Sequence, residues 1–326
     1  MPLRRRTFLQ LAANATALIS LKRTATAADT YPSRPIRLIC GFSPGSASDI
    51  NARLFAKGAS DILGQQVVVE NKPGAAGTLA GQYVAHAAND GYTLFLFALS
   101  TLTNEIINPH PVVDVSKDFA PIALLSNGTV VLVVNPASNV HTVAELIALG
   151  KAKPGELLAG STGAGSHPQL TAALFAQRVG IKVTDVPYPG SPQVTQDLLA
   201  GRITMSFNIA SATIGQINAG QLTALATTAS KRAAALPNVP TMAEAGIADF
   251  ETSLWLGLAA PAGTPGPVID KLADAARKSM HNADAVETLS KQGYEPLDGG
   301  PDEFAAFIKS EIARWTEVTR VAGIKS

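Results

Sequence analysis

An apolar run, a loop of glycine and hydroxyl residues, and a helical run follow one another repeatedly along this chain. The first unit has its apolar run at 36–40, its loop at 41–49 and its helical run at 50–63. The alternation continues with a strand at 66–70, a helix at 77–87 and a strand at 93–98. Strands and helices that alternate at this spacing predict an α/β fold with parallel strands and helices on both faces.

A second set of units follows a capping box at Thr142–Glu145, which predicts the start of a helix. Its strands are predicted at 157–159, 183–186 and 203–208, and its loops at 160–167, 188–191 and 209–213. Neighbouring parallel strands end at the same edge of a sheet, so these three loops are expected to lie side by side.

The rhythm breaks between the two sets, where prolines separate the helices and two apolar runs follow each other directly. We place a first crossing between two lobes at 130–135 and a return crossing at 252–259, with helices from 267 to the end of the chain. The prediction is therefore a first lobe of residues 28–132 and 254–326 and a second lobe of residues 133–253. Each lobe is expected to hold a mainly parallel sheet flanked by helices, and two crossing strands would form a hinge.

Residues 1–27 have the composition of an export signal, because Arg4–Arg6 precede Phe8 and Leu9, and an A-x-A site ends at Ala27. The paired arginines indicate a twin-arginine signal; a basic N-terminal helix of the folded domain is the alternative. Five of the 26 Lys and Arg residues and none of the 25 Asp and Glu residues lie there, which leaves 21 − 25 = −4 for the mature chain. A mildly acidic chain argues against nucleic acid, and the absence of a long apolar run argues against membrane insertion.

The loops after the strands are rich in hydroxyls and contain neither arginine nor lysine. The hydroxyl residues are Ser43, Ser46, Ser48, Ser100, Thr101, Ser161, Thr162, Ser166, Ser191 and Ser211. An anion bound by such loops would be held by helix N-termini, hydroxyls and ordered water. Asp49 is either a counter-ion for a ligand amine or a helix-capping residue, and His167 either donates to an anion or closes its loop.

Residues 41–45 also match G-x-S-x-G, the nucleophile elbow of serine hydrolases, with Ser43 as the nucleophile. The residue after that nucleophile must supply a backbone N–H to the oxyanion hole, and here it is Pro44, which has none. We therefore expect no catalytic residue and keep a secreted serine hydrolase as the alternative. No histidine pair has metal-ligand spacing and no nucleotide motif follows a strand, so neither a metal nor a cofactor is expected.

Seven short motifs together resemble one family over nearly the whole mature chain. They are YPSRPI at 31–36, PGSASD at 44–49, VENKPGAAG at 69–77, DGYTL at 90–94, KDFAPI at 117–122, VPY at 186–188 and LPNVPT at 236–241. With them the chain resembles the Bug family, the extracytoplasmic solute-binding proteins of tripartite tricarboxylate transporters. The family usually has a second glycine where this chain has Ser46, so a side chain enters the first loop.

The resemblance implies a two-lobed periplasmic-binding-protein (Venus-flytrap) fold that binds a small organic acid or amino acid between its lobes. By this analogy the ligand-binding residues are Phe42, Ser43, Gly45, Ser46, Ala47, Asp49, Ser100, Thr101, Gly163, Gly165, Ser166, His167, Gly190, Ser191, Asn208, Ala210 and Ser211. The expected protein is a periplasmic monomer that delivers a carboxylate to the membrane subunits of a transporter. A binding protein that serves a sensory pathway is a further alternative.

Overall fold

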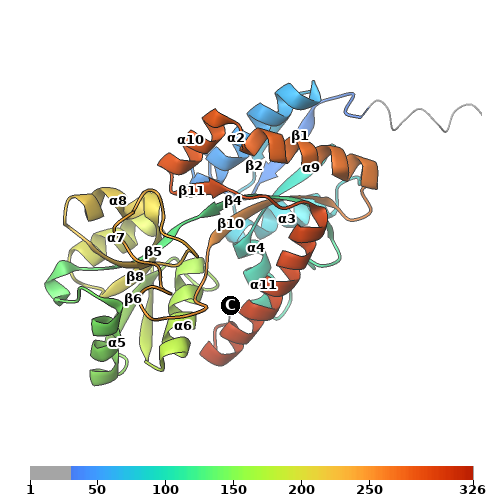
Figure 1. The fold of residues 1–326 in the computed structure, drawn as a ribbon. Helices are drawn as coiled ribbons and strands as arrows, with labels where there is room; N and C mark the ends of the chain where they lie inside the picture. Colours follow the sequence, from blue (N-terminus) through green and yellow to red (C-terminus); the bar gives the residue numbers. More distant parts are fainter. Residues whose placement is uncertain (1–30, 326) are drawn as a thin grey trace, which may run out of the picture.

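The computed structural model describes residues 31–325, so the predicted export signal lies outside the described residues. Over this range the chain forms two lobes, each built on one β-sheet with helices packed against it (Figure 1). The two-lobed α/β fold predicted from the alternation is therefore confirmed.

The sheet of the first lobe has six strands. In spatial order they are β11 (Tyr294–Pro296), β4 (Phe119–Gly128), β10 (Leu254–Pro261), β3 (Thr93–Ala98), β1 (Ile36–Cys40) and β2 (Val67–Asn71). β1 is parallel to β2 and β3, whereas β10 is antiparallel to both β3 and β4, and β11 is antiparallel to β4. Four of the six strands, β1 to β4, thus run in one direction. Its helices are α2 (Ala47–Leu63), α3 (Thr78–Ala85), α4 (Leu99–Ile107), α9 (Gly266–Met280), α10 (Ala283–Lys291) and α11 (Pro301–Ala322).

The sheet of the second lobe has five strands. Their spatial order is β7 (Val183–Pro187), β6 (Leu157–Ser161), β8 (Met205–Ile209), β5 (Val130–Val134) and β9 (Thr223–Thr227). β6 is parallel to β7 and β8, and β5 is antiparallel to β8 and β9, so β5 alone runs against the other four. Its helices are α5 (Val143–Ala152), α6 (His167–Val179), α7 (Ser191–Leu199) and α8 (Ala210–Asn218).

Two of the reversed strands, β5 and β10, enter their sheets from the other lobe. The chain leaves the first sheet at the end of β4, passes through Thr129 and starts β5 at once in the second sheet. All of β5 pairs within the second sheet, so the crossing lies just before the predicted segment 130–135. The domain boundaries given above stay a prediction.

Helices cover both faces of each sheet, which explains why the inner strands β3 and β5 are nearly all apolar. Every residue of β3 and β5 is buried. One core of the first lobe packs α2 and α9 on the sheet, and the other packs α3, α4 and α11 on the opposite face. Helix α11 also packs against α6 of the second lobe, so it joins the two lobes outside the crossing segments (Figure 1).

The hydroxyl residues Ser100 and Thr101 were expected in a loop after a strand, but this segment is the beginning of α4. Leu99 and Leu102 are buried and Ile106 is partly buried, and all three pack on one core of the first lobe. Apolar residues three and four positions apart favour a helix, and here they outweigh the turn preference of the hydroxyl residues between them. Ser100 and Thr101 therefore lie on the first turn of a helix.

Candidate ligand-binding site

The predicted loops of the two lobes face each other because of the strand directions. β5 starts at the edge of its sheet that is next to the first lobe, and it runs opposite to β6, β7 and β8. These three strands therefore end at the edge next to the first lobe. By the same reasoning from β10, β1 and β3 end at the edge next to the second lobe.

One hydrogen bond joins α4 of the first lobe directly to a loop of the second lobe. The Thr103 hydroxyl of α4 donates to the carbonyl oxygen of Gly165 in the β6–α6 loop, at 2.9 Å in a buried position. Gly165 has a φ of +72°, and a Cβ there would lie 2.6 Å from Ile107 Cδ1. Only glycine allows this approach of the loop to α4.

The first loop ends in a capped helix. Ser46 is the N-cap of α2, and its hydroxyl accepts the Asp49 N–H at 3.2 Å. The helical hydrogen bonds begin with Ile50 N–H to Ser46 C=O. The N–H groups of Ala47 and Ser48 precede this bond and point out of the helix with the positive end of its dipole.

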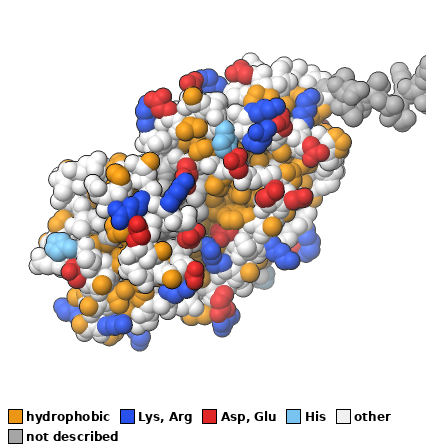
Figure 2. All heavy atoms as spheres, in the orientation of Figure 1, with side chains coloured by type: hydrophobic (Ala, Val, Ile, Leu, Met, Phe, Trp, Pro, Cys, Tyr) orange, Lys and Arg blue, Asp and Glu red, His pale blue; other side chains and the backbone are white. Residues whose placement is uncertain are grey.

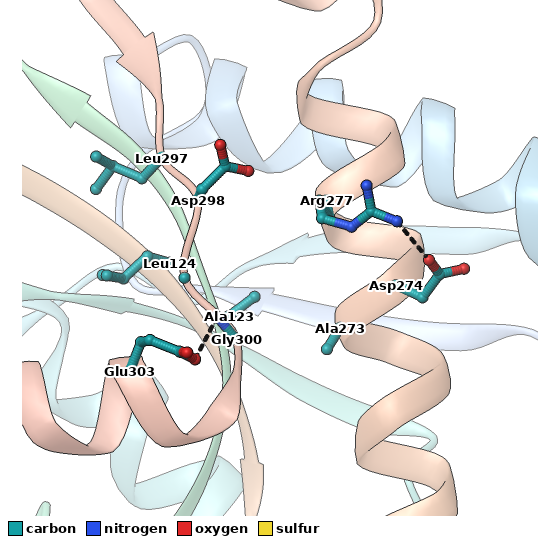
Figure 3. A pocket seen from close by; sticks show the side chains of 10 residues that line it. Ala123, Leu124, Ala273, Asp274, Arg277, Leu297, Asp298, Gly300 and Glu303 are labelled. Carbon is teal, nitrogen blue, oxygen red and sulfur yellow. Dashed lines mark hydrogen bonds and ion pairs between the residues drawn. The ribbon is translucent and has the colours of Figure 1, made fainter.

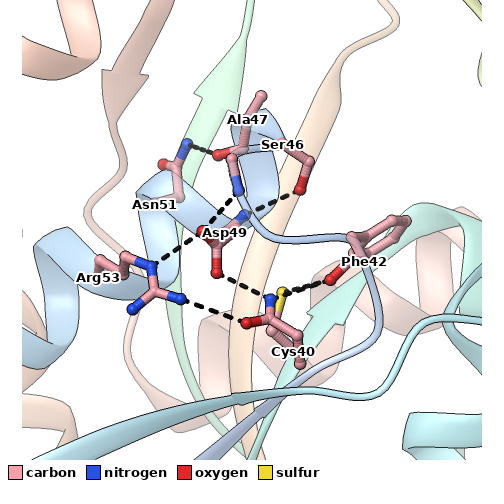
Figure 4. A network of polar contacts seen from close by, with 9 residues as sticks. Cys40, Phe42, Ser46, Ala47, Asp49, Asn51 and Arg53 are labelled. Carbon is pink, nitrogen blue, oxygen red and sulfur yellow. Dashed lines mark hydrogen bonds and ion pairs between the residues drawn. The ribbon is translucent and has the colours of Figure 1, made fainter.

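Asp49 supports the loop from behind (Figure 4). Its carboxylate accepts hydrogen bonds from Gly45 N–H at 2.9 Å, Arg53 Nε at 2.9 Å and Asn71 Nδ2 at 2.8 Å. Asn71 Nδ2 also donates to Phe42 C=O at 2.9 Å. Both carboxylate oxygens of Asp49 are thus used within the protein, which favours a structural role over contact with a ligand amine, and the helix cap is Ser46 rather than Asp49.

Asp49 stays ionised despite its burial. Its side chain is only 3% exposed, and burial alone would raise its pKa. The hydrogen bonds from Arg53, Gly45 and Asn71 outweigh that effect and lower the pKa below its ordinary value. A buried negative charge therefore lies in the first turn of α2, and its cationic partner is Arg53.

Phe42 and Thr101 both lie close to Gly77, in the turn that precedes α3. A Cβ on Gly77 would lie 3.4 Å from Thr101 Oγ1 and 3.5 Å from Phe42 Cζ. Thr101 is fully buried, and its hydroxyl has no hydrogen-bond partner among the described residues. A Cβ on Gly41 would lie only 2.5 Å from Gly77 Cα, which explains the glycine at the start of the loop.

The β6–α6 loop of the second lobe, like the first loop, is held by internal hydrogen bonds and ends in an N-cap serine. Gly163 C=O accepts the Ser166 N–H at 3.1 Å, and Gly165 N–H is bound by Gln169 Oε1 at 2.9 Å. Ser166 is the N-cap of α6, yet its hydroxyl is buried without a partner in the described part of the chain. A buried hydroxyl without a partner is unfavourable, which makes Ser166 a candidate ligand contact.

His167 is buried where α6 meets α11. Its ring is buried 3.3 Å from the Thr171 hydroxyl and packs edge to face on Trp315 of α11. Burial lowers its pKa from 6.5 to about 4, so the ring is neutral at pH 7. Burial of the ring argues against donation to an anion, and its contacts are with Thr171 of α6 and Trp315 of α11.

The remaining predicted residues follow β7 and β8. Gly190 is the N-cap of α7, where it has no side chain to cap the helix, and Ser191 is the first residue of α7. Asn208 is buried in β8 with its Nδ2 unpartnered among the described residues. Ala210 and Ser211 start α8 and line a 230 Å³ cavity together with Ser290, Lys291 and Gly293 of the first lobe, so both approach the lobe interface.

Sequence analysis missed Arg53, Asn71 and Thr103 as parts of this site. Arg53 follows Asp49 by four residues on one helix, so the sequence alone could have predicted this ion pair. Asn71 and Thr103 reach the site through β2 and α4, and no local pattern indicates those contacts.

Ser43 is exposed, and its carbonyl oxygen accepts the Ser46 N–H at 3.2 Å. Among the described residues, no histidine is hydrogen-bonded to Ser43. Within the same range no group of three His, Cys, Asp or Glu residues is placed to hold a metal ion.

A separate hollow lies on the first lobe, away from these loops (Figure 3). It has a volume of about 440 Å³ and lies between α9, β4 and the start of α11. Arg277 and Asp274 pair with each other on its wall at 3.0 Å, and Gly300 N–H is bound by Glu303. These polar groups are already satisfied by one another, so the hollow adds nothing to the candidate site.

The surface carries charges of both signs. Acidic and basic side chains are interspersed over the face in Figure 2 rather than gathered by sign. No described helix is both long and apolar enough to cross a membrane.

Two sheet-based lobes whose loops face each other form the architecture of two-lobed solute-binding proteins. The chain belongs to the tripartite tricarboxylate transporter receptor family, the Bug proteins, because the model of this family matches residues 51–324. It is 37% identical over 300 residues to Protein BugT of Bordetella pertussis, covering 91% of this chain and 92% of BugT. The family and its structures are periplasmic solute-binding proteins rather than enzymes.

Two solved structures of similar proteins from Rhodopseudomonas palustris carry bound ligands. Rpa4515 with adipate is 32% identical, with a TM-score of 0.79 over 90% of this chain and 99% of that one. MatC with bound malate is 30% identical, with a TM-score of 0.75 over 88% of this chain and 99% of that one. The family resemblance stated from the motifs is thus confirmed.

Proposed function

We propose that this protein captures a small carboxylate between its lobes and delivers it to the membrane subunits of a tripartite tricarboxylate transporter. The observation that carries the proposal is a set of unpartnered, uncharged donors near the facing edges. The hydroxyls of Thr101 and Ser166 and the amide of Asn208 are buried without partners among the described residues. Leaving such a group unpaired costs about 1–3 kcal/mol, so a ligand or its bridging waters would satisfy them.

A carboxylate is the ligand that best fits these donors. The helix N-termini at Ala47 and Ser48 and at Ser166 favour negative charge, and the loops offer no full positive charge. Hydroxyls, amides and N–H groups can hold a carboxylate without a lysine or arginine. Adipate and malate, which are named for two similar structures, are both dicarboxylates.

The wider setting of the proposal comes from the family and the sequence. A receptor of this family acts in the periplasm, and we propose export by the twin-arginine route and action as a monomer. The residues expected to contact ligand are those of the first loop, the first turn of α4, the β6–α6 loop and the ends of β7 and β8. Asp49 and His167 are proposed to support these loops from behind.

Thermal unfolding against a ligand panel tests the carboxylate proposal. Adipate, malate, citrate, aromatic acids and amino acids would be compared with adipamide and malamide, which keep the shape and lose the charge. We expect at least one carboxylate to raise the melting temperature and its amide to leave it unchanged, because a ligand that binds only the folded state stabilises it. Equal shifts by acid and amide, or no shift with any carboxylate, would contradict the proposal.

A further inference from the structure

We infer that Arg53 is a charge-compensating residue for the candidate site, and this inference rests on the proposed binding of a carboxylate. Arg53 lies on α2, outside the loops, and its side chain is 54% exposed. It belongs to none of the predicted ligand contacts. Its effect on a ligand would pass through Asp49 and the loop that Asp49 holds.

The first observation is that the site carries a negative charge where an anion is to bind. The Asp49 carboxylate is buried in the first turn of α2 and fixes the loop through Gly45 N–H at 2.9 Å. The N–H groups of Ala47 and Ser48 lie in the same turn. An uncompensated carboxylate at this position would repel a ligand carboxylate and oppose the positive end of the helix dipole.

The second observation is that Arg53 donates hydrogen bonds to both Asp49 and Asn71. Its Nε donates to Asp49 Oδ2 at 2.9 Å, and its NH2 donates to Asn71 Oδ1 at 3.2 Å (Figure 4). The guanidinium is planar and always charged, so one side chain neutralises Asp49 and orients the Asn71 amide toward Phe42 C=O.

Together these contacts explain how a site without Lys or Arg in its loops can accept an anion. The Asp49–Arg53 pair has no net charge. Asp49 can therefore hold the loop through Gly45 N–H without repelling an anionic ligand. Arg53 is therefore a positioning and charge-balancing residue.

Titration calorimetry with adipate and malate on Arg53→Met tests the inference. At pH 7.5 we expect affinity about three- to tenfold weaker than in the wild type, because the Asp49 charge is no longer balanced. Removing the cation also raises the pKa of Asp49, whose burial remains. The ratio of wild-type to variant affinity should therefore shrink as the pH falls from 7.5 to 5 and Asp49 takes up a proton.

Two further variants separate charge from structure. Arg53→Lys keeps the positive charge and should bind nearly as tightly as the wild type. Lys57→Met removes a charge one turn further along the exposed side of α2 and should leave the affinity unchanged. Melting curves would show whether each variant is folded, and should Arg53→Met not fold, Arg53→Gln takes its place in the same titration.

The possible failures are distinguishable. If the wild type binds neither adipate nor malate nor any other carboxylate of the panel, the proposed function fails and the inference fails with it. If the wild type binds and Arg53→Met binds equally well, or its loss of affinity is the same at every pH, the function stands and the inference is overturned.

Discussion

The imidazole of His167 and the indole of Trp315 pack edge to face, with ring centroids 6.5 Å apart and ring planes at 69°. His167 starts α6 of the second lobe, and Trp315 lies on α11 of the first lobe. The contact therefore links the loop that carries Ser166 to the helix that spans the lobe interface.

Stability should fall between pH 6.5 and pH 4 because of His167. Burial lowers its folded pKa from 6.5 to about 4, so in this window the unfolded chain holds the proton and the folded chain does not. The stabilisation is complete above pH 6.5 and is lost as the pH falls toward 4, by up to about 3 kcal/mol. Denaturant unfolding of His167→Gln at several pH values should show a shallower loss than the wild type. His110→Gln, at an exposed histidine, should lose stability with falling pH as steeply as the wild type. An equally steep loss in His167→Gln would contradict the role of His167.

Glu311 should be essential to the packing of α11. Its Oε2 accepts the indole N–H of Trp255 and of Trp315, both at 2.9 Å, and the residue is buried. Glu311→Ala leaves two buried indole donors unpaired and should cost about 3–5 kcal/mol in the free energy of unfolding, measured with urea. Glu317→Ala removes an exposed pair with Arg320 on the same helix and should cost less than about 1 kcal/mol. Similar losses in the two variants would contradict the role of Glu311.

Much of the fold was predictable because its elements follow local rules. The apolar runs 36–40 and 93–98 became β1 and β3 with the same bounds, and Gly64 ends α2 with a left-handed φ of +68°. The Thr142–Glu145 capping box formed as predicted. In each case the residues that decide the structure are neighbours in sequence.

The parts that escaped prediction depend on distant partners. β11 has three residues and exists because it pairs with β4, so no periodicity could reveal it. Asp49 was considered as a helix cap because acidic residues favour the first turn, but its partners Gly45, Arg53 and Asn71 come from three segments. The burial of His167 depends on Trp315, almost 150 residues later.

Thr103→Val should weaken ligand binding more than it weakens the fold. The hydroxyl joins α4 to Gly165 C=O across the lobes, and valine keeps the shape while removing the bond. With adipate or malate as the probe, we expect about a three- to tenfold loss of affinity by calorimetry, equivalent to one hydrogen bond of about 1 kcal/mol. Thr103→Ser keeps the hydroxyl and should bind like the wild type. Unchanged affinity in Thr103→Val would mean that the bond does not contribute to lobe closure.

Ser46 allows the capping and binding roles of the first loop to be measured separately. Its hydroxyl oxygen accepts the Asp49 N–H at 3.2 Å, which leaves its own O–H free to donate toward a bound carboxylate. Ser46→Ala removes the cap and should cost about 1 kcal/mol of stability, whereas glycine is itself a good N-cap, so Ser46→Gly should cost only a few tenths. Both variants lose the same O–H donor and should lose the same factor in affinity for the carboxylate that raises the melting temperature. If instead Ser46→Ala loses more affinity than Ser46→Gly, as it loses more stability, the hydroxyl acts only through the helix cap and does not contact the ligand.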